Sequence, residues 1–328
     1  MRAWSRFFTA ILILGGFFFI RKYLDHLLEV EGQLHDYGSE LSVSVGDYVL
    51  TKAYGVVGLD TTFAAKYRHL QTTAATQHEM SATLVSPDCI DRIVVMGKIN
   101  DEDTSWVRKL PRWKNAVYSV DNDTWPLHTS TNKGREANVY LTYLVENYVK
   151  LPMIIAFVHP HERGYPQAWH TDAESYSNVE SLSSLNTSFV LSNGYANLRC
   201  IAIPGCPDEI QPFRGEHGDG RSAEHAFVDA WNQIFENNNV PKVVGIPCCA
   251  QFAVSRDQVH KRPLEFYVGA LRWLHDTPLD DATSGRVFEY LWHVIFGRDP
   301  VYCPDLNQCY HDVYRKPLRE RNAINYDG

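Results

Sequence analysis

After a long N-terminal region, the sequence alternates apolar runs of strand length with a helical pattern. Residues 93–99 and 116–120 form two such runs, residues 136–148 repeat apolar side chains at helical spacing, and residues 153–158 form a third run. Strand, helix, strand order is the signature of a parallel α/β sheet. We therefore predict an α/β fold in which one domain with a mixed or parallel sheet occupies residues 91–315.

The C-terminal half adds three segments of helical pattern and one more apolar run. Apolar side chains recur at helical spacing over residues 222–236, 263–275 and 284–296. Residues 243–246 predict one further strand, and Ser255 follows an apolar run as a helix-capping residue. These elements complete the predicted domain.

The N-terminus carries an uncharged apolar segment, residues 7–20, with basic residues on both sides. Fourteen residues are few for a membrane span, but flanking arginines that reach the membrane surface can extend it. No small-residue cleavage site follows, so we expect an uncleaved signal anchor over residues 1–22. A stem (23–90) and a C-terminal tail (316–328) would flank the domain. A buried N-terminal helix is the alternative.

An anchored chain of this kind is expected to be a single-pass membrane protein of the secretory pathway (Golgi or ER) rather than of the cytosolic face. Glycosylation sequons at Asn122 and Asn186 fit a glycoprotein. The formal net charge is 31 − 39 = −8, which argues against an extended nucleic-acid-binding surface.

Seven cysteines leave at least one unpaired, and no CxxC pair indicates zinc. Cys200 with Cys206, and Cys303 with Cys309, could each close a short loop in a lumenal domain. We expect the adjacent pair Cys248 and Cys249 to be buried core residues.

Polar clusters follow all three predicted strands, at the edge where a parallel sheet binds ligands. A divalent ion such as Mn or Zn could use carboxylates one residue apart, as in a DxD motif, or imidazoles. The predicted metal ligands are Asp121, Asp123, His159, His161 and His170. Ordinary turn and capping roles are the alternative for each cluster.

Acid–base chemistry is expected from carboxylates and a histidine. Glu289 and His293 are four residues apart in a predicted helix, so they would share one face. The predicted catalytic residues are Asp103, Asp121, Glu136, Glu289 and His293.

Residues 131–136 (TNKGRE) place Lys133, Gly134 and Arg135 at the start of a helix. Free N–H groups, the positive end of the helix dipole and two cations make an anion site there, and glycine lets the backbone approach a phosphate. The predicted substrate-binding residues are Asn132, Lys133, Gly134, Arg135, Trp169, Gln251 and Arg256. A glycine turn with solvated charges is the alternative.

Five separated blocks, NKGREANVYLTYLVENY, LPMIIAFVHPHERGYPQAWH, GYANLRCIAIPGCP, PCCAQFAVSRDQV and SGRVFEYLWHVIFG, resemble a large, mostly fungal family that carries a domain of unknown function. Several blocks also resemble distant versions of nucleotide-sugar glycosyltransferase motifs. This resemblance implies a glycosyltransferase-like transferase of secondary metabolism or glycan assembly, with a nucleotide sugar or another phosphate-bearing donor. The alternatives are a tRNA-dependent, arginine-containing cyclodipeptide synthase-like enzyme and a non-catalytic lectin-like or scaffold protein.

Overall fold

The computed structural model describes residues 91–215 and 220–317. The predicted anchor (1–22), the stem (23–90) and most of the tail (316–328) lie outside these residues. Within the described ranges, no helix is long and apolar enough to cross a membrane.

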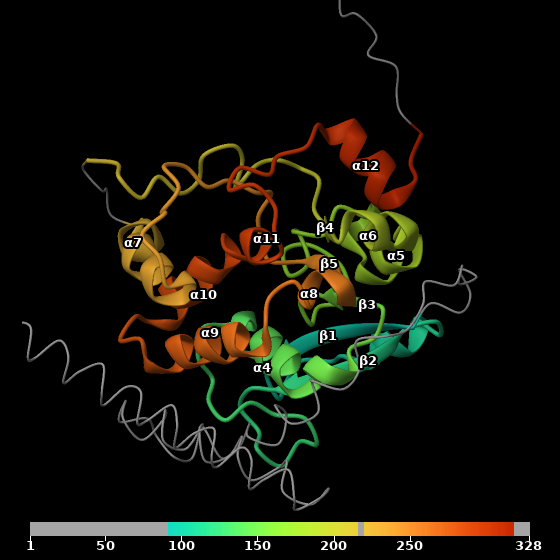
Figure 1. Cartoon of the computed structure of the whole chain (residues 1–328). Helices are drawn as coiled ribbons and strands as arrows, with labels where there is room; N and C mark the ends of the chain where they lie inside the picture. Colours follow the sequence, from blue (N-terminus) through green and yellow to red (C-terminus); the bar gives the residue numbers. More distant parts are fainter. Residues whose placement is uncertain (1–90, 216–219, 318–328) are drawn as a thin grey trace, which may run out of the picture. The chain divides into compact units, whose positions relative to one another are not determined.

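The described residues form one mixed five-stranded sheet with the order β2-β1-β3-β5-β4 (Figure 1). The strands are β1 (Arg92–Lys98), β2 (Lys114–Ser119), β3 (Ile154–Phe157), β4 (Tyr195–Asn197) and β5 (Phe252–Ser255). β1 pairs in parallel with β2 and β3, whereas β5 is antiparallel to both β3 and β4. The predicted mixed α/β domain is therefore confirmed.

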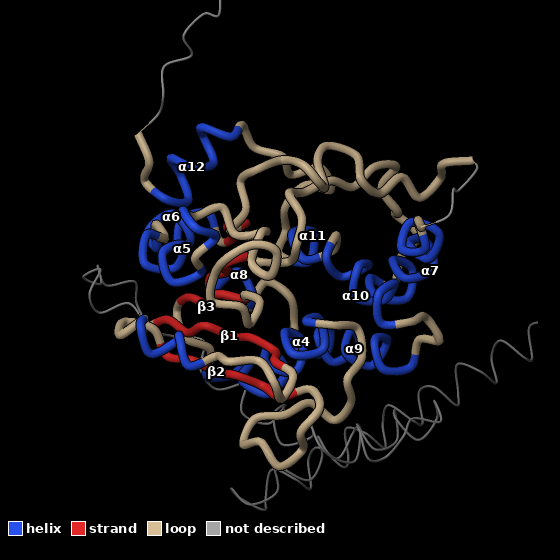
Figure 2. The backbone as a smooth tube through the Cα atoms, turned by 180° about the vertical axis from the view of Figure 1, so that it is seen from behind, coloured by secondary structure: helices blue, strands red, loops and turns tan. Residues whose placement is uncertain are grey.

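Helices cover both faces of the sheet (Figures 1 and 2). On one face, Val94, Ile154 and Ala253 belong to an apolar cluster that includes residues of α5, α6 and α12. On the other face, Phe157 and Phe252 pack against Tyr140 of α4 and Trp292 of α11. The bounds are η2 (Ser105–Lys109), α4 (Glu136–Asn147), η3 (Tyr148–Lys150), η4 (Glu174–Tyr176), α5 (Asn178–Ser184), α6 (Thr187–Asn193), α7 (Ser222–Phe235), α8 (Arg256–Val259), α9 (Leu264–Asp276), α10 (Asp281–Glu289), α11 (Trp292–Ile295) and α12 (Leu306–Tyr314).

Two predicted elements are wrong. Residues 243–246 form only single bridges, Ile210 with Val244 and Gly245 with Val301, instead of a strand. The helix predicted over residues 284–296 is two helices, α10 and α11. The Leu291 N–H donates to the Phe288 carbonyl three residues back, and this tighter turn ends the first helix. Trp292 then packs on Phe252 of the sheet.

The predicted cysteine pairing is also wrong, because the disulfides are Cys200–Cys309 and Cys206–Cys303. They link positions 109 and 97 residues apart, so they tie the segment after β4 to the C-terminal region instead of closing short local loops. Cys248 and Cys249 form a third disulfide with each other.

Candidate functional site

The loop after β3 is held in place by a chain of buried polar groups. Gln251 accepts a hydrogen bond from the His159 N–H at 2.9 Å and donates to Thr171 Oγ1 at 3.2 Å. Thr171 in turn donates to the Asn178 amide oxygen, and Asn178 donates to the His161 carbonyl at 2.8 Å. Because β5 runs antiparallel to β3, Gln251 at its start lies beside the end of β3. The network therefore positions the predicted histidines at the expected edge of the sheet.

His159 and His170 are brought together by this loop. Their ring centroids lie 4.4 Å apart, and the Nε2 atom of each is buried without a hydrogen-bond partner within the described residues. Burial and the neighbouring His170 hold the pKa of His159 well below its ordinary value of 6.5. Burial and His161 lower the pKa of His170 to about 4. Both rings are therefore neutral near pH 7 and can donate or accept a hydrogen bond.

His161 points to a different partner. Its Nε2 lies 3.5 Å from a carboxylate oxygen of Glu102, which follows β1. The polar ends of β1 and β3 thus meet, as the strand order predicts.

Glu136 begins α4 and follows a tight turn. Gly134 and Arg135 both have positive φ, 65° and 53°, which only glycine adopts without strain. A Cβ on Gly134 would lie 2.4 Å from Leu274 Cδ1, so glycine is also required for close packing against α9. Burial, with a smaller contribution from the charge of Glu289, raises the pKa of Glu136 to about 7.

Glu289 lies at the end of α10. Its Oε1 accepts a hydrogen bond from the Cys249 N–H at 2.7 Å, and its Oε2 lies 3.7 Å from the Arg286 guanidinium. The same Arg286 is also paired with Glu209 at 2.5 Å. Burial raises the pKa of Glu289, although Arg286 and the Cys249 N–H both oppose the rise.

We treat the carboxylates and the histidines as one site, because Arg135 and Cys249 each influence both kinds of group. The charge of Arg135 lowers the pKa values of His159, Glu136 and Glu289. The Cys249 N–H donates to Glu289 Oε1, and the Cys249 backbone also acts on His159 by raising its pKa. We define Arg135, Glu136, His159, His170 and Glu289 as the carboxylate–histidine site.

Two further polar atoms are buried close to this site. Tyr140 lies one turn after Glu136 in α4, and the charge of Glu136 contributes to raising its pKa. The Tyr140 hydroxyl and the Trp292 Nε1 have no hydrogen-bond partner within the described residues. Buried polar groups are nearly always paired, so orphaned atoms around a buried acid favour a ligand-binding role. Neither residue was predicted, because both sit in apolar helical patterns that predict core.

Trp169 is 38% exposed beside the histidines. Its indole lies 5.9 Å from the His170 ring, and the Arg199 guanidinium lies 5.0 Å from its centroid on a cation–π contact. The buried Arg199 is paired with Asp172 at 3.3 Å. Trp169 is therefore a firmly held, solvent-facing ring next to the carboxylate–histidine site.

The predicted phosphate cradle is largely occupied by the protein itself. The Lys133 ammonium donates to the Leu279 carbonyl, and the Gly134 N–H donates to Asp281 Oδ1 at 3.3 Å. Asn132 is exposed. Of the predicted cations at this helix start, Arg135 remains exposed.

Two other predicted substrate-binding residues, Gln251 and Arg256, make contacts within the protein. Gln251 is buried, with both ends of its amide used in the loop network described above. Arg256 begins α8 at the opposite end of β5, where its N–H donates to the Met153 carbonyl and its side chain lies 3.5 Å from Asp257. It is thus at the far edge of the sheet from the histidines.

Two of the predicted acidic residues, Asp103 and Asp121, are exposed turn residues. Asp103 accepts from the N–H and the hydroxyl of Ser105, which lowers the pKa of Asp103. Asp121 accepts from the Asn100 N–H and from the Ser119 hydroxyl, and the Asn100 bond is the main cause of its lowered pKa. Asp121 therefore ties the ends of β1 and β2 together.

No three of the five predicted metal ligands have candidate ligand atoms within 4.8 Å of one another. Within the described ranges, the one group of three or more candidate ligands with atoms inside 4.8 Å of one another is Cys248, Cys249 and Glu289. Both cysteines of that group are in a disulfide. Asp121 instead accepts a hydrogen bond from Asn100 in a turn, and His161 faces Glu102. Neither is grouped in this way with the other predicted ligands, Asp123, His159 and His170.

His293 does not share a face with Glu289, because the helix breaks between them. It is fully buried in α11, its Nε2 lies 2.9 Å from the Pro300 carbonyl, and burial lowers its pKa to about 4. Its Nδ1 is buried without a hydrogen-bond partner within the described residues.

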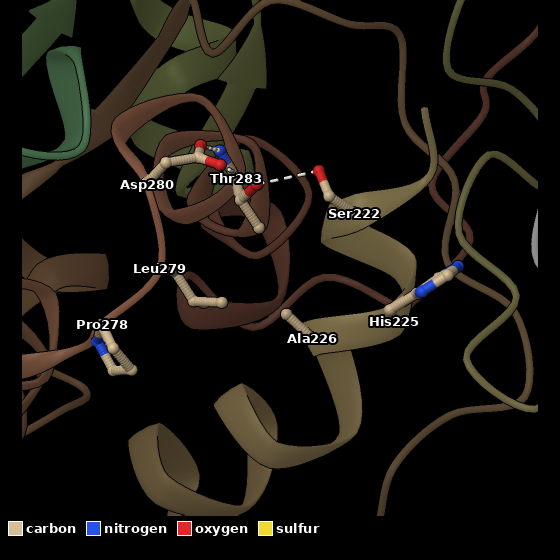
Figure 3. Close-up of a pocket in the computed structure, with 7 residues that line it drawn as sticks. All are labelled: Ser222, His225, Ala226, Pro278, Leu279, Asp280 and Thr283. Carbon is tan, nitrogen blue, oxygen red and sulfur yellow. Dashed lines mark hydrogen bonds between the residues drawn. The ribbon is translucent and has the colours of Figure 1, made fainter. Parts of the chain in front are cut away.

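An open hollow of about 460 Å³ lies between α7 and the start of α10 (Figure 3). Its walls include a hydrogen bond from Thr283 Oγ1 to Ser222 Oγ at 2.8 Å. The hollow is lined by Ser222, His225, Ala226, Pro278, Leu279, Asp280 and Thr283. None of these residues belongs to the carboxylate–histidine site. The carboxylate–histidine site has the shifted pKa values and the unpartnered buried atoms described above, so we favour that site over the hollow as the place of catalysis.

Comparison with known proteins places the chain in a family. No curated protein and no solved structure matches it. A family profile described as "Protein of unknown function (DUF3431)" matches residues 94–312, a range that contains all five blocks quoted above and the whole carboxylate–histidine site. The match covers well over half of the sequence, and the chain therefore belongs to the DUF3431 family.

Proposed function

We propose that this chain is a group-transfer enzyme in which Glu136 is the general base that activates the acceptor. The observation that carries the proposal is the pair of buried imidazole Nε2 atoms, of His159 and His170, that have no hydrogen-bond partner within the described residues and lie in the same site as Glu136. Burial, with Glu289, raises the pKa of Glu136 to about 7. A general base works best when its pKa is near the working pH, and an ordinary glutamate is far too weak. A largely buried carboxyl group with a second carboxylate nearby typically reaches such a value, because burial and the like charge both disfavour its ionised form.

The proposed donor is a nucleotide sugar or another phosphate-bearing molecule, as the glycosyltransferase-like blocks imply. Arg135 supports this choice, because it is an exposed cation at the start of α4, where the helix dipole also favours an anion. Lys133 is engaged with Leu279, so Arg135 would carry the diphosphate contact.

In the proposed step, the acceptor hydroxyl gives its proton to the Glu136 carboxylate while its oxygen forms a bond to the donor carbon. The bond from that carbon to the leaving phosphate oxygen breaks, and the diphosphate departs with the electron pair. The neutral His159 and His170 rings would hydrogen-bond the substrate through their unpartnered Nε2 atoms. The Tyr140 hydroxyl could serve the same purpose.

Calorimetric titration of nucleoside diphosphates tests the donor assignment. An arginine fork grips two phosphate oxygens, so Arg135→Lys should weaken binding although charge is kept. Loss of one charge-assisted bond costs about 1.5–3 kcal/mol, or roughly a ten- to hundredfold drop in affinity. Arg108→Lys, at an exposed position in η2, is the matched control and should bind as the wild type does.

Unchanged affinity in Arg135→Lys would show that Arg135 does not hold the diphosphate. If the wild type binds no nucleoside diphosphate, the nucleotide-sugar donor is excluded. The same titration with aminoacyl-tRNA then separates a tRNA-dependent synthase from a non-catalytic scaffold.

A further inference from the structure

The Cys248–Cys249 disulfide cannot be explained by folding stability in the way that the other two can. Cys200–Cys309 and Cys206–Cys303 join residues 109 and 97 positions apart, so each removes much of the freedom of the unfolded chain. Cys248 and Cys249 are sequence neighbours. A loop this short has almost no closure entropy to remove. Stabilisation of the fold by loop closure therefore does not account for the Cys248–Cys249 bond.

The backbone at this bond is held in a costly conformation. Cys249 and Ala250 have φ values of 91° and 52°, which residues other than glycine rarely adopt. The segment is clamped from outside, because the Cys248 N–H donates to the Pro204 carbonyl and Gly205 packs against the Ile246 carbonyl. Strained backbone that its surroundings hold in place is characteristic of functional sites.

The strained segment touches both halves of the carboxylate–histidine site. The Cys249 N–H donates to Glu289 Oε1 at 2.7 Å, and the Cys249 backbone raises the pKa of His159. The two sulfur atoms and a Glu289 oxygen lie within 4.8 Å of one another. Cys248 is buried, whereas Cys249 is partly exposed. Cys249 is thus the residue of the pair that is partly open to solvent.

We propose that Cys248–Cys249 is a reversible dithiol–disulfide site that reacts with small dithiols, and that opening the bond releases the Cys249 backbone from Glu289 and loosens the site that includes His159. This inference does not depend on the transfer reaction proposed above, because it concerns a second reactive group and its effect on the geometry of the site.

The exchange is balanced with one dithiol as the reductant. A thiolate of the dithiol attacks Cys249 Sγ, the Cys249–Cys248 sulfur bond breaks, and Cys248 leaves as a thiolate. The second thiol of the reductant, as its thiolate, then attacks the reductant sulfur of the mixed disulfide and releases the Cys249 thiolate. The dithiol is oxidised to its cyclic disulfide, the protein gains two electrons, and the two cysteine thiolates take up the two protons that the dithiol gave up.

The reactivity is tested by treating the folded, oxidised protein with rising concentrations of dithiothreitol, followed by iodoacetamide alkylation and peptide mapping. We expect Cys248 and Cys249 to be alkylated first. Cys206–Cys303 is the matched control, because both of its residues are partly exposed, and the buried Cys200–Cys309 pair should react last. The proposal is overturned if Cys248 and Cys249 are free thiols in the oxidised protein, or if they react only together with the long cross-links.

The structural effect is tested by the rate at which diethylpyrocarbonate modifies His159, read by mass spectrometry. In protein whose Cys248–Cys249 bond alone is reduced, the rate should rise roughly tenfold, which corresponds to about 1.4 kcal/mol of lost local protection. The double variant Cys248→Ser with Cys249→Ser should behave in the same way. The matched double variant Cys206→Ser with Cys303→Ser should leave the rate unchanged. An equal His159 rate in oxidised and reduced wild type would overturn the coupling, whether or not the serine variant folds.

Discussion

Replacing Glu136 with glutamine should change how the stability of the fold depends on pH. The pKa of this carboxyl is raised from 4.5 to about 7 in the folded protein. Below pH 4.5 the group is protonated in both states and has no effect. As pH rises toward 7, the unfolded chain loses its proton while the folded protein keeps it, so stability falls. Each pKa unit corresponds to about 1.36 kcal/mol, which gives a total loss of about 3 kcal/mol.

Glutamine cannot ionise, so Glu136→Gln should lack this loss. The measurement is chemical denaturation of both proteins at intervals between pH 4.5 and 8.5. The difference in unfolding free energy, variant minus wild type, should rise by about 3 kcal/mol across this range. Other titrating groups are shared by the two proteins and largely cancel. Glu174→Gln, at an exposed position, is the control and should show no such rise. A difference that is flat with pH would refute the raised pKa and with it the assignment of Glu136 as a base.

Three further outcomes follow from the fold and from the N-terminal segment. Gly134→Ala should lower the unfolding free energy by roughly 2–5 kcal/mol, because it adds left-handed strain and a clash with Leu274. The control Gly269→Ala, in an open part of α9, should be neutral or stabilising, and equal denaturation midpoints of the two variants would contradict this. Gln251→Leu should cost roughly 1–3 kcal/mol for each buried group it leaves unpaired, measured in the same way, and no loss would show that the loop network is dispensable. Deleting residues 1–22 should yield a soluble, folded protein by gel filtration and circular dichroism, and aggregation would contradict the proposed anchor.

The sheet and its main helices were predictable because their patterns are local. β1, β2, β3, α4, α7 and α9 each agree with a predicted segment to within a few residues. The break between α10 and α11 was not predictable, because apolar side chains continue at helical spacing through Tyr290 and Leu291. Trp292, just after the break, packs on Phe252 of the sheet, and such a long-range contact leaves no local signal.

The candidate site was predictable in its residues more than in its arrangement. Glu136, Glu289, His159 and His170 were all expected to serve chemistry, but nothing local indicates that Glu136 and Glu289 influence each other across more than a hundred residues of chain. The contact of Lys133 with the Leu279 carbonyl was not predictable, because the two residues are remote in sequence.

The cysteines show the same limit. Four cysteines permit several pairings, and spacing alone favours short loops, whereas the fold brings the segment after β4 beside the C-terminal region. The adjacency of Cys248 and Cys249 was a visible signal, but it does not distinguish two core thiols from a disulfide.

Release of nucleoside diphosphate from a panel of nucleotide sugars, with water or an added hydroxyl compound as acceptor, tests the proposed base and donor together. The wild type should consume at least one donor, at a rate that rises as pH increases through about 7, where Glu136 ionises. Glu136→Gln should lower kcat by roughly 10²–10⁴-fold with little change in KM. Consumption of a donor at an equal rate by Glu136→Gln, or no consumption of any donor by the wild type, would contradict the account.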